Sequence, residues 1–410
     1  MSTPLRKLVY LASASTFCCA AFAPLAQAQT SPYYVGVAQT IQHESNLIRL
    51  RDGQALPAGR SESDIVSSTA LVAGVDQTFG RQRLTGSASL RANRYSENSS
   101  FNSQGYSLNM GLDWQTIESL KGNVTVGADR SQRPDLRDRN GQYLSTGNNE
   151  NIERVNATVS MGVAGPLALE AGVNALRTRY AASGASYAEY QQNGASAGVR
   201  YRLGGSTSVA LTLRHSNIQY PNLLINQADP NDRRRRNDVE ISGVWAATGA
   251  SSFDVRLSQG KTRYDQLNAR DFSGNTGSLA WTWLPSGKLR VTTRLARDSG
   301  QNASLATTAF SQLTDTLSIN ADYQLSGKIT ASAGLNRNRR QLDGSGLNVA
   351  GASGSDDGGS ASIGLRWAVL RSATLGCTAS TESRGKNSNP LLNEAYSANV
   401  FSCFGQLVLQ

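Results

Sequence analysis

The side chains best suited to nucleophilic catalysis in this sequence are two histidines that stand close to hydroxyl groups. His215 precedes Ser216, and His43 is followed by Glu44 and Ser45. A nucleophile and its base must lie on the same wall of a site, whereas neighbouring residues of a strand point to opposite faces. His215 and Ser216 therefore cannot form a dyad within a strand. The sequence also lacks phosphate-loop and dinucleotide-binding motifs, and we expect no enzymatic activity.

Two of the cysteines are candidates for a disulfide. Of the four cysteines, two lie in the apolar N-terminal stretch, and Cys377 and Cys403 remain near the other end. A pair of this kind in neighbouring predicted strands of an exported protein favours a disulfide. A metal site would need further cysteines or histidines nearby, and both histidines are remote in the sequence. We predict a cross-strand disulfide that faces lipid, no metal and no cofactor.

Most of the remaining chemistry belongs to charged residues that alternate with apolar ones. In residues 106 to 116, Leu108, Leu112 and Trp114 share one face with the other apolar residues, and Asp113 lies on the opposite face. A dry core behind Asp113 would isolate a buried charge, whereas a water-filled barrel would not. We therefore predict an aqueous lumen. Its wall is expected to contain Asp76, Arg83, Arg91, Asp113, Asp129, Arg154, Glu170, Arg200, Arg202, Glu240, Asp254, Arg256, Arg290, Arg294, Asp322 and Arg366.

A run of four arginines, Arg233, Arg234, Arg235 and Arg236, precedes a predicted strand that begins at Asp238. We place this basic cluster in a loop. A basic run in a loop is usually just solvated, and the more specific interpretation is a contact with acidic polysaccharide or with lipopolysaccharide phosphate.

The stretch from Leu279 to Ala296 indicates which elements position the charges. Leu279, Trp281 and Trp283 share one face, residues 285 to 287 form a tight turn, and the alternation resumes from Leu289. A period of two on both sides of a short turn predicts a β-hairpin. The tryptophans lie near the turn on the apolar face, where the interfacial aromatic girdle of a membrane barrel would be.

Similar strands recur to the end of the chain, with short and long connections in alternation. We count about eighteen strands, with sixteen as the alternative. An open sheet of this length would leave edge groups unpaired in hydrocarbon, so it must close. The sequence thus predicts an all-β fold, a transmembrane antiparallel up-and-down β-barrel of the bacterial outer membrane, wide enough for an aqueous channel.

The N-terminus has the features of an export signal. Arg6 and Lys7 precede a largely apolar stretch, and Ala26-Gln27-Ala28 matches a cleavage site. We therefore divide the chain into a signal peptide, residues 1 to 28, and a single barrel domain, residues 29 to 410. No later segment has the roughly 20 consecutive apolar residues of a membrane helix.

The formal net charge is +10, and only six of the 40 basic residues are lysines. Arginine binds carboxylates and phosphates in a fixed fork, which suits either internal ion pairs with lumen acids or contacts with anionic sugars. An exported chain without a recognition helix is not expected to bind nucleic acid.

Several local motifs resemble one family. The run from Arg270 to Gly277, the Trp281-Thr282-Trp283 doublet and residues 285 to 289 are similar to outer-membrane β-barrel proteins encoded in exopolysaccharide-biosynthesis operons, the EpsL type within the β-barrel porin families. Arg236 to Val239 and His43 to Leu47 resemble the same family, although Glu44-Ser45 replaces an expected Asp-rich pair. The resemblance implies a part in the export or surface assembly of exopolysaccharide.

Three functions therefore stay open. The first is a porin-like channel for exopolysaccharide, with polysaccharide as substrate and membrane lipid, lipopolysaccharide and periplasmic export components as partners. The second is a non-conducting scaffold for a polysaccharide assembly complex. The third is a general diffusion porin. The sequence does not indicate the oligomeric state.

Overall fold

Eighteen antiparallel strands form one sheet in the computed structural model of the chain. The structure describes residues 31–117, 120–138, 141–144, 148–162, 165–204, 206–223, 232–265, 271–302, 310–343, 353–389 and 394–409. The expected signal peptide, residues 1 to 28, lies outside these ranges. Within them, no helix is long and apolar enough to cross a membrane.

The strands follow the order of the chain around the sheet. Their bounds are β1 Tyr33–Glu44, β2 Asp64–Phe79, β3 Gln82–Tyr95, β4 Ser103–Gln115, β5 Lys121–Gln132, β6 Asn149–Met161, β7 Leu167–Tyr180, β8 Tyr190–Gly204, β9 Thr207–Tyr220, β10 Asp232–Thr248, β11 Ser251–Tyr264, β12 Phe272–Ser286, β13 Leu289–Asn302, β14 Phe310–Gln324, β15 Ile329–Asp343, β16 Gly354–Ala368, β17 Ala373–Arg384 and β18 Tyr396–Leu409. Two short 3₁₀ helices, η1 Ser99–Phe101 and η2 Ser183–Ala188, lie between strands.

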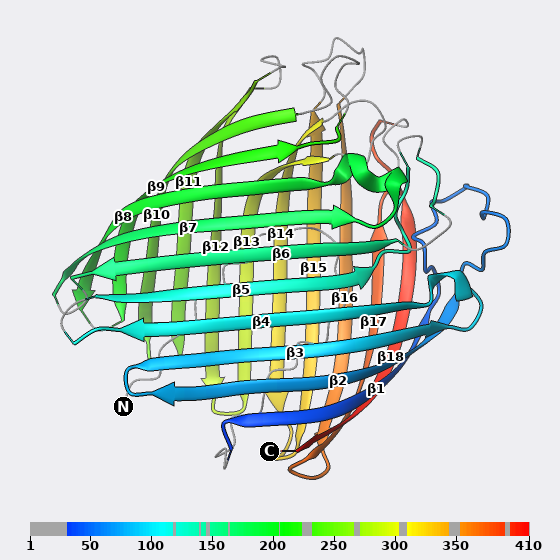
Figure 1. The fold of residues 1–410 in the computed structure, drawn as a ribbon, viewed down its shortest axis with the longest axis horizontal. Coiled ribbons are helices and arrows are strands. Elements are labelled where there is room, and N and C mark those ends of the chain that lie inside the picture. The colour runs from blue at the N-terminus through cyan, green and yellow to red at the C-terminus, as the bar shows by residue number, and fades with distance from the viewer. Residues whose placement is uncertain are drawn as a thin grey trace.

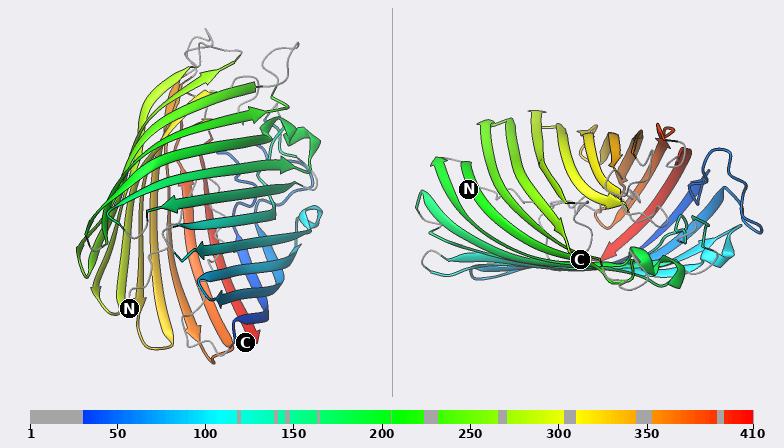
Figure 2. Two further views of the ribbon diagram at one scale, coloured as in Figure 1. Left: turned by 60° about the vertical axis from the view of Figure 1, so that its left-hand side comes forward. Right: turned by 90° about the horizontal axis from the view of Figure 1, so that it is seen from above.

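The sheet closes on itself because β1 pairs with β18 as well as with β2. Val35 lies opposite Leu409, so the start of β1 and the end of β18 meet at one end of the barrel. Strands β3 to β8 cross β12 to β16 at a large angle in Figure 1, as the tilted strands on opposite walls of a barrel must. Figure 2 shows the wall from two further directions. The predicted fold class, an antiparallel barrel of eighteen strands, is confirmed.

Short and long connections alternate around the barrel. Connections of two to five residues follow the even-numbered strands, and connections of seven to nineteen residues follow the odd-numbered ones. One end therefore consists of tight turns, and the other carries all the long segments. Outer-membrane barrels have this asymmetry, with the short turns on the periplasmic side.

The outer face of the sheet is apolar and exposed. Leu90, Leu257 and Ile363 expose 62%, 63% and 67% of their surface, and many other leucines, valines and isoleucines are similar. Each belongs to a strand in which every second residue faces the same way. A water-soluble protein rarely exposes so large a continuous apolar surface, so this face requires an apolar environment.

The opposite face is polar and lies inside the barrel. Arg256 on β11 reaches within 3.9 Å of Asp298 on β13, although β12 lies between these strands. Side chains of non-adjacent strands converge only on the concave side of a curved sheet. The face that carries Arg256 and Asp298 is therefore the inner wall.

Aromatic side chains gather on the outer face near the short turns. Trp245, Phe253, Trp281 and Trp283 form a continuous row on β10, β11 and β12, with successive ring centroids 5.4 to 6.1 Å apart. Trp245 and Trp283 are exposed, Phe253 and Trp281 are partly buried, and the stacked row matches the interfacial girdle expected from the sequence.

The four consecutive arginines do not lie in a loop, as the sequence analysis placed them. They belong to β10, which starts at Asp232 and pairs with both neighbours through this region. Arg234 is buried on the inner face, where it donates to the hydroxyl groups of Tyr220 and Tyr264 and lies over both rings. These contacts on two neighbouring strands stabilise the extended backbone, although the local sequence has little strand propensity.

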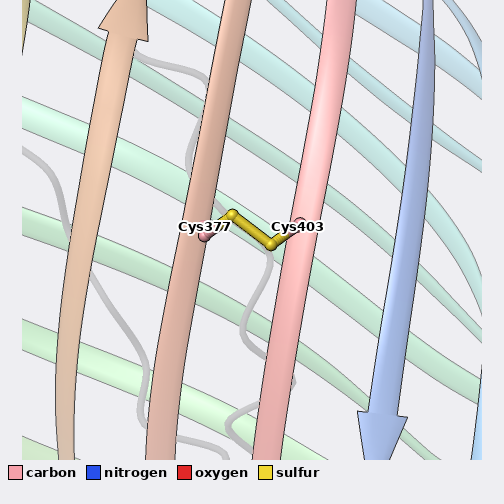
Figure 3. Close-up of a disulfide and its surroundings, with 2 residues drawn as sticks. All are labelled: Cys377 and Cys403. Carbon is pink, nitrogen blue, oxygen red and sulfur yellow. A yellow bond between two sulfur atoms is a disulfide. The ribbon is translucent and has the colours of Figure 1, made fainter.

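Cys377 on β17 and Cys403 on β18 lie directly opposite each other and form a disulfide, as predicted (Figure 3). Both follow the alternation of outward residues on their strands, with Leu375 and Phe401 on the same face. The bond joins residues 26 apart in the sequence and cross-links the last hairpin of the barrel.

Replacing both cysteines in the variant Cys377→Ser/Cys403→Ser should lower the free energy of unfolding by about 3 kcal/mol, because the cross-link restricts a loop of this length in the unfolded chain. Urea unfolding followed by the gel shift of the heat-modifiable barrel measures the difference. Two alkylatable thiols in the non-reduced native protein would contradict the bond itself.

The assignment of the two faces predicts opposite behaviour for neighbouring positions of β4. A cysteine in the variant Asn109→Cys should react rapidly with a membrane-impermeant maleimide in reconstituted protein, because Asn109 faces the inside. The matched variant Leu108→Cys should be protected by lipid. Equal reaction rates at the two positions would refute the assignment.

Candidate functional site: the polar inner wall and its mouth

Ion pairs between neighbouring strands occupy the inner wall of β2 to β8. Arg83 donates to both oxygens of Asp76 at 2.7 and 2.5 Å. Arg154 donates to Asp129 at 2.6 Å. These pairs bring together four of the predicted lumen residues. At their partial exposure such pairs contribute little to stability, so their main effect is to fix charged groups along the wall.

A third pair continues this row. Arg200 donates to the two oxygens of Glu170 at 2.7 and 2.8 Å, and to the Ser208 hydroxyl at 3.3 Å. Arg202, two residues further along β8, donates to the Gly165 carbonyl at 2.6 Å, next to a short turn. Arg202 therefore lies at the rim of the barrel and not in its middle.

Glu240 is the centre of a larger cluster on β9 to β13. Its carboxylate lies 3.6 Å from Arg214 and 3.8 Å from Arg256, and Arg256 also approaches Asp298. Arg214 and Asp298 were not among the predicted lumen residues. The signal was present, because both alternate with outward apolar residues on their strands, Leu213 and Leu295 among them.

The other predicted residues follow the same face without forming one cluster. Asp113 accepts from Asn123 at 2.6 Å. Arg290 lies opposite Asp322 in the register of β13 and β14. The remaining four are placed by register alone: Arg91 opposite Ala70 and Gly105, Asp254 opposite Val244 and Ala280, Arg294 opposite Ala280 and Ser318, and Arg366 opposite Thr330 and Gly376.

The inner wall of β14 to β17 is chemically different from the rest. Asp322 and Arg366 are inward near the short turns, and Arg340, Asp356, Glu382 and Arg384 are inward near the long segments. The inward positions between these two sets carry neutral hydroxyl and amide groups or glycine. They are Thr316, Ser318, Asn320, Thr330, Ser332, Gly334, Asn336, Asn338, Gly358, Ser360, Ser362, Gly364, Thr374, Gly376, Thr378 and Ser380. The inside of the barrel thus has a charged part and a neutral, hydrogen-bonding part.

We call the end of the barrel that carries the long segments its mouth. A network of largely buried ion pairs links several segments there. Arg340 contacts Asp356 at 2.5 Å and Glu394 at 3.0 Å, and Glu394 also receives Arg384 and Arg51 at 3.1 and 3.4 Å. Burial alone would raise the pKa of Glu394, but the surrounding guanidinium groups hold the pKa below its usual value. The network joins the segment after β1 to the segment before β18.

Arg49 ties the same segment to two distant parts of the barrel. Its guanidinium pairs with Glu44 and lies 3.3 Å from Glu382 on β17. Its carbonyl accepts from the Tyr143 hydroxyl at 3.0 Å and from Arg137 at 3.4 Å, both in the connection between β5 and β6. Arg49 has a φ of 53°, a left-handed conformation that non-glycine residues adopt only where the surroundings enforce it.

A small apolar core supports this arrangement. Leu47 and Ile48 pack with Val66, Tyr95 and Phe101, and all five are buried. The mouth of the barrel therefore has a fixed structure on this side, where the connection after β1 packs against residues of β2, β3 and η1.

His215 and Ser216 do not form a dyad in the structure. His215 lies on the outer face, where its Nδ1 is 2.7 Å from the Asn237 Oδ1, and Ser216 points to the inner face. No group of three or more histidine, cysteine or acidic residues in the described ranges is placed to bind a metal.

The lowered pKa of Glu394 predicts a pH-dependent mouth. A carboxyl group with a depressed pKa stabilises the fold above its unfolded-state value, near 4.5, and loses this contribution as the pH falls through the folded-state value. The amide of Asp52, which donates to the Ala395 carbonyl at 2.9 Å, should lose hydrogen-exchange protection below about pH 4.5.

In the variant Glu394→Gln the protection of Asp52 should be weak at all pH values. The matched control Glu170→Gln, which removes the pair with Arg200 near the short turns at the other end of the barrel, should behave as the wild type. Unchanged protection of Asp52 down to pH 3 in the wild type would contradict the role of the network.

Comparisons with known proteins bear on the fold and not on the ligand. The sequence matches no protein-family model and no curated protein. Among solved structures, Pseudomonas aeruginosa OccK2 (OpdF) matches with a TM-score of 0.50 and 13% identity, over 92% of this chain and 98% of that one.

The outer membrane protein OpdK from Pseudomonas aeruginosa and Acinetobacter baumannii OccAB3 give TM-scores of 0.48, at 14% and 9% identity, over 92% of this chain and 99% of each. The closed sheet of eighteen strands and the match to OccK2 (OpdF) show the fold of an 18-stranded outer-membrane β-barrel, without assignment to a family.

Proposed function

We propose that this protein is an outer-membrane channel that takes part in the export of an exopolysaccharide. The observation that carries the proposal is the division of a single closed sheet into an apolar outer face and a polar inner wall. A barrel of about eighteen strands is wide enough to enclose water, and the inner charges need that water.

The spacing of outward side chains fits a membrane. The pair Arg235 and Arg263 lies ten residues from the pair Trp245 and Phe253 on both β10 and β11 (245 minus 235, and 263 minus 253). At about 3.3 Å per residue and a tilt of 35 to 45°, ten residues span roughly 25 Å across a bilayer. This equals the height of the apolar band of an outer-membrane barrel.

The chemistry of the inner wall supports a sugar polymer as the substrate. The hydroxyl and amide groups of β14 to β17 can exchange hydrogen bonds with sugar hydroxyls, and the arginines on the other strands can attract acidic sugars. A polymer that slides needs many weak contacts, since one tight site would stop it. The resemblance of the 270–289 region to proteins of exopolysaccharide operons points the same way.

A non-conducting scaffold is the second candidate. The mouth network favours it, because Arg49 links β17 to the connection between β5 and β6 and so fixes chain at one opening of the barrel. A general diffusion porin is the third candidate, and its substrates would be small solutes instead of a polymer.

Conductance separates the channel from the scaffold. The purified, heat-modifiable protein should form pores in planar bilayers, with a preference for anions because of Arg290 and Arg294. The variant Arg290→Glu/Arg294→Glu should shift the reversal potential towards cation selectivity. Arg297→Glu, a change on the outer face, is the control and should leave selectivity unchanged. A folded protein without conductance would defeat the channel proposal.

The polymer role is tested in the cell. Deleting the gene should reduce secreted polysaccharide several-fold without loss of small-solute uptake, and wild-type protein should restore secretion. Normal secretion together with reduced uptake of small solutes would identify a general diffusion porin instead.

A further inference from the structure

Four basic side chains form a patch on the outer face of two neighbouring strands. On β10, Arg233 and Arg235 are exposed, while Arg234 between them and Asp232 before them are buried. On β11, Lys261 and Arg263 are exposed in the same alternation. We call Arg233, Arg235, Lys261 and Arg263 the outer basic patch.

The register concentrates this charge. Arg235 lies directly opposite Arg263, and Lys261 is the next outward residue of β11. Like charges directly opposite in an antiparallel pair destabilise a sheet. Asp265 contacts the patch, 2.9 Å from Arg235. In the described part of the chain, Lys261 and Arg263 have no carboxylate within 4 Å.

The patch borders the apolar band of the barrel. Val239, Ile241 and Leu257 follow towards the short turns, and each exposes more than half of its surface. The patch itself lies about 25 Å from the aromatic row, at the opposite boundary of the proposed membrane. A ligand here therefore meets apolar surface on one side and four cationic groups on the other.

We propose that the outer basic patch binds the phosphate groups of lipopolysaccharide, with the acyl chains against Val239, Ile241 and Leu257. The inference rests on the proposed membrane location but not on conduction or on the polymer. A phosphorylated glycolipid is the ligand that combines several negative charges with acyl chains at this level. A soluble acidic polysaccharide could bind the basic groups, but it has no apolar part that would contact Val239, Ile241 and Leu257.

Native mass spectrometry of the full-length mature protein, titrated with purified lipopolysaccharide in detergent, tests the assignment. The wild type should bind, and the variant Lys261→Glu/Arg263→Glu should bind about thirtyfold more weakly, since each basic group near an anionic surface contributes on the order of fivefold in affinity. Enzymatically dephosphorylated lipopolysaccharide should bind the wild type as weakly.

The control variant Lys288→Glu/Lys328→Glu changes the same charge in two short turns at the other end of the barrel. It should bind as the wild type does. Equal affinity of the patch variant and the wild type, an equal loss in the control, or equal competition by lipid-free acidic polysaccharide would overturn the inference. Heat-modifiable mobility shows that each variant is folded, and membrane fractionation of the wild type tests the location separately.

Discussion

The hydrogen bonds between β1 and β18 close the sheet, and the other properties of the barrel depend on that closure. Backbone groups at an open edge could not be satisfied in hydrocarbon. Once the edges pair, every strand has two neighbours and two faces, and each side chain must belong to one face or the other. An apolar exterior and a wet, charged interior then follow from a period of two in the sequence. The same alternation places Glu240 inside and Leu257 outside on adjacent strands.

Closure also explains why the charges of the inner wall are tolerated. Asp76, Asp129 and Glu170 each meet an arginine from a neighbouring strand, and the interior between them admits water. The neutral wall of β14 to β17 needs no such pairing. The two parts together offer ionic and hydroxyl contacts to a passing molecule, which is the basis of the proposed polymer route.

Much of this could be predicted from the sequence because strand alternation is a local property. Asp113, Arg290 and the Cys377–Cys403 pair follow from counting residues along regular strands. The start of β10 could not be found that way, since four arginines lack strand propensity and are held by Tyr220 and Tyr264 on other strands. The mouth was missed for the same reason: Arg49, Tyr143 and Glu394 are far apart in the sequence and meet only through tertiary contacts. Alternation along a single strand does not predict contacts between residues so far apart in the sequence.

The position of the disulfide has a consequence for assembly. Cys377 and Cys403 face each other in only one alignment of β17 and β18, so oxidation selects that alignment and excludes strand slippage in the terminal hairpin. Because the disulfide fixes the register of this hairpin, the free edge of β18 can pair with β1 without a change in the alignment of β17 and β18. The last pairing that closes the barrel then forms between β18, whose register with β17 is already fixed, and β1.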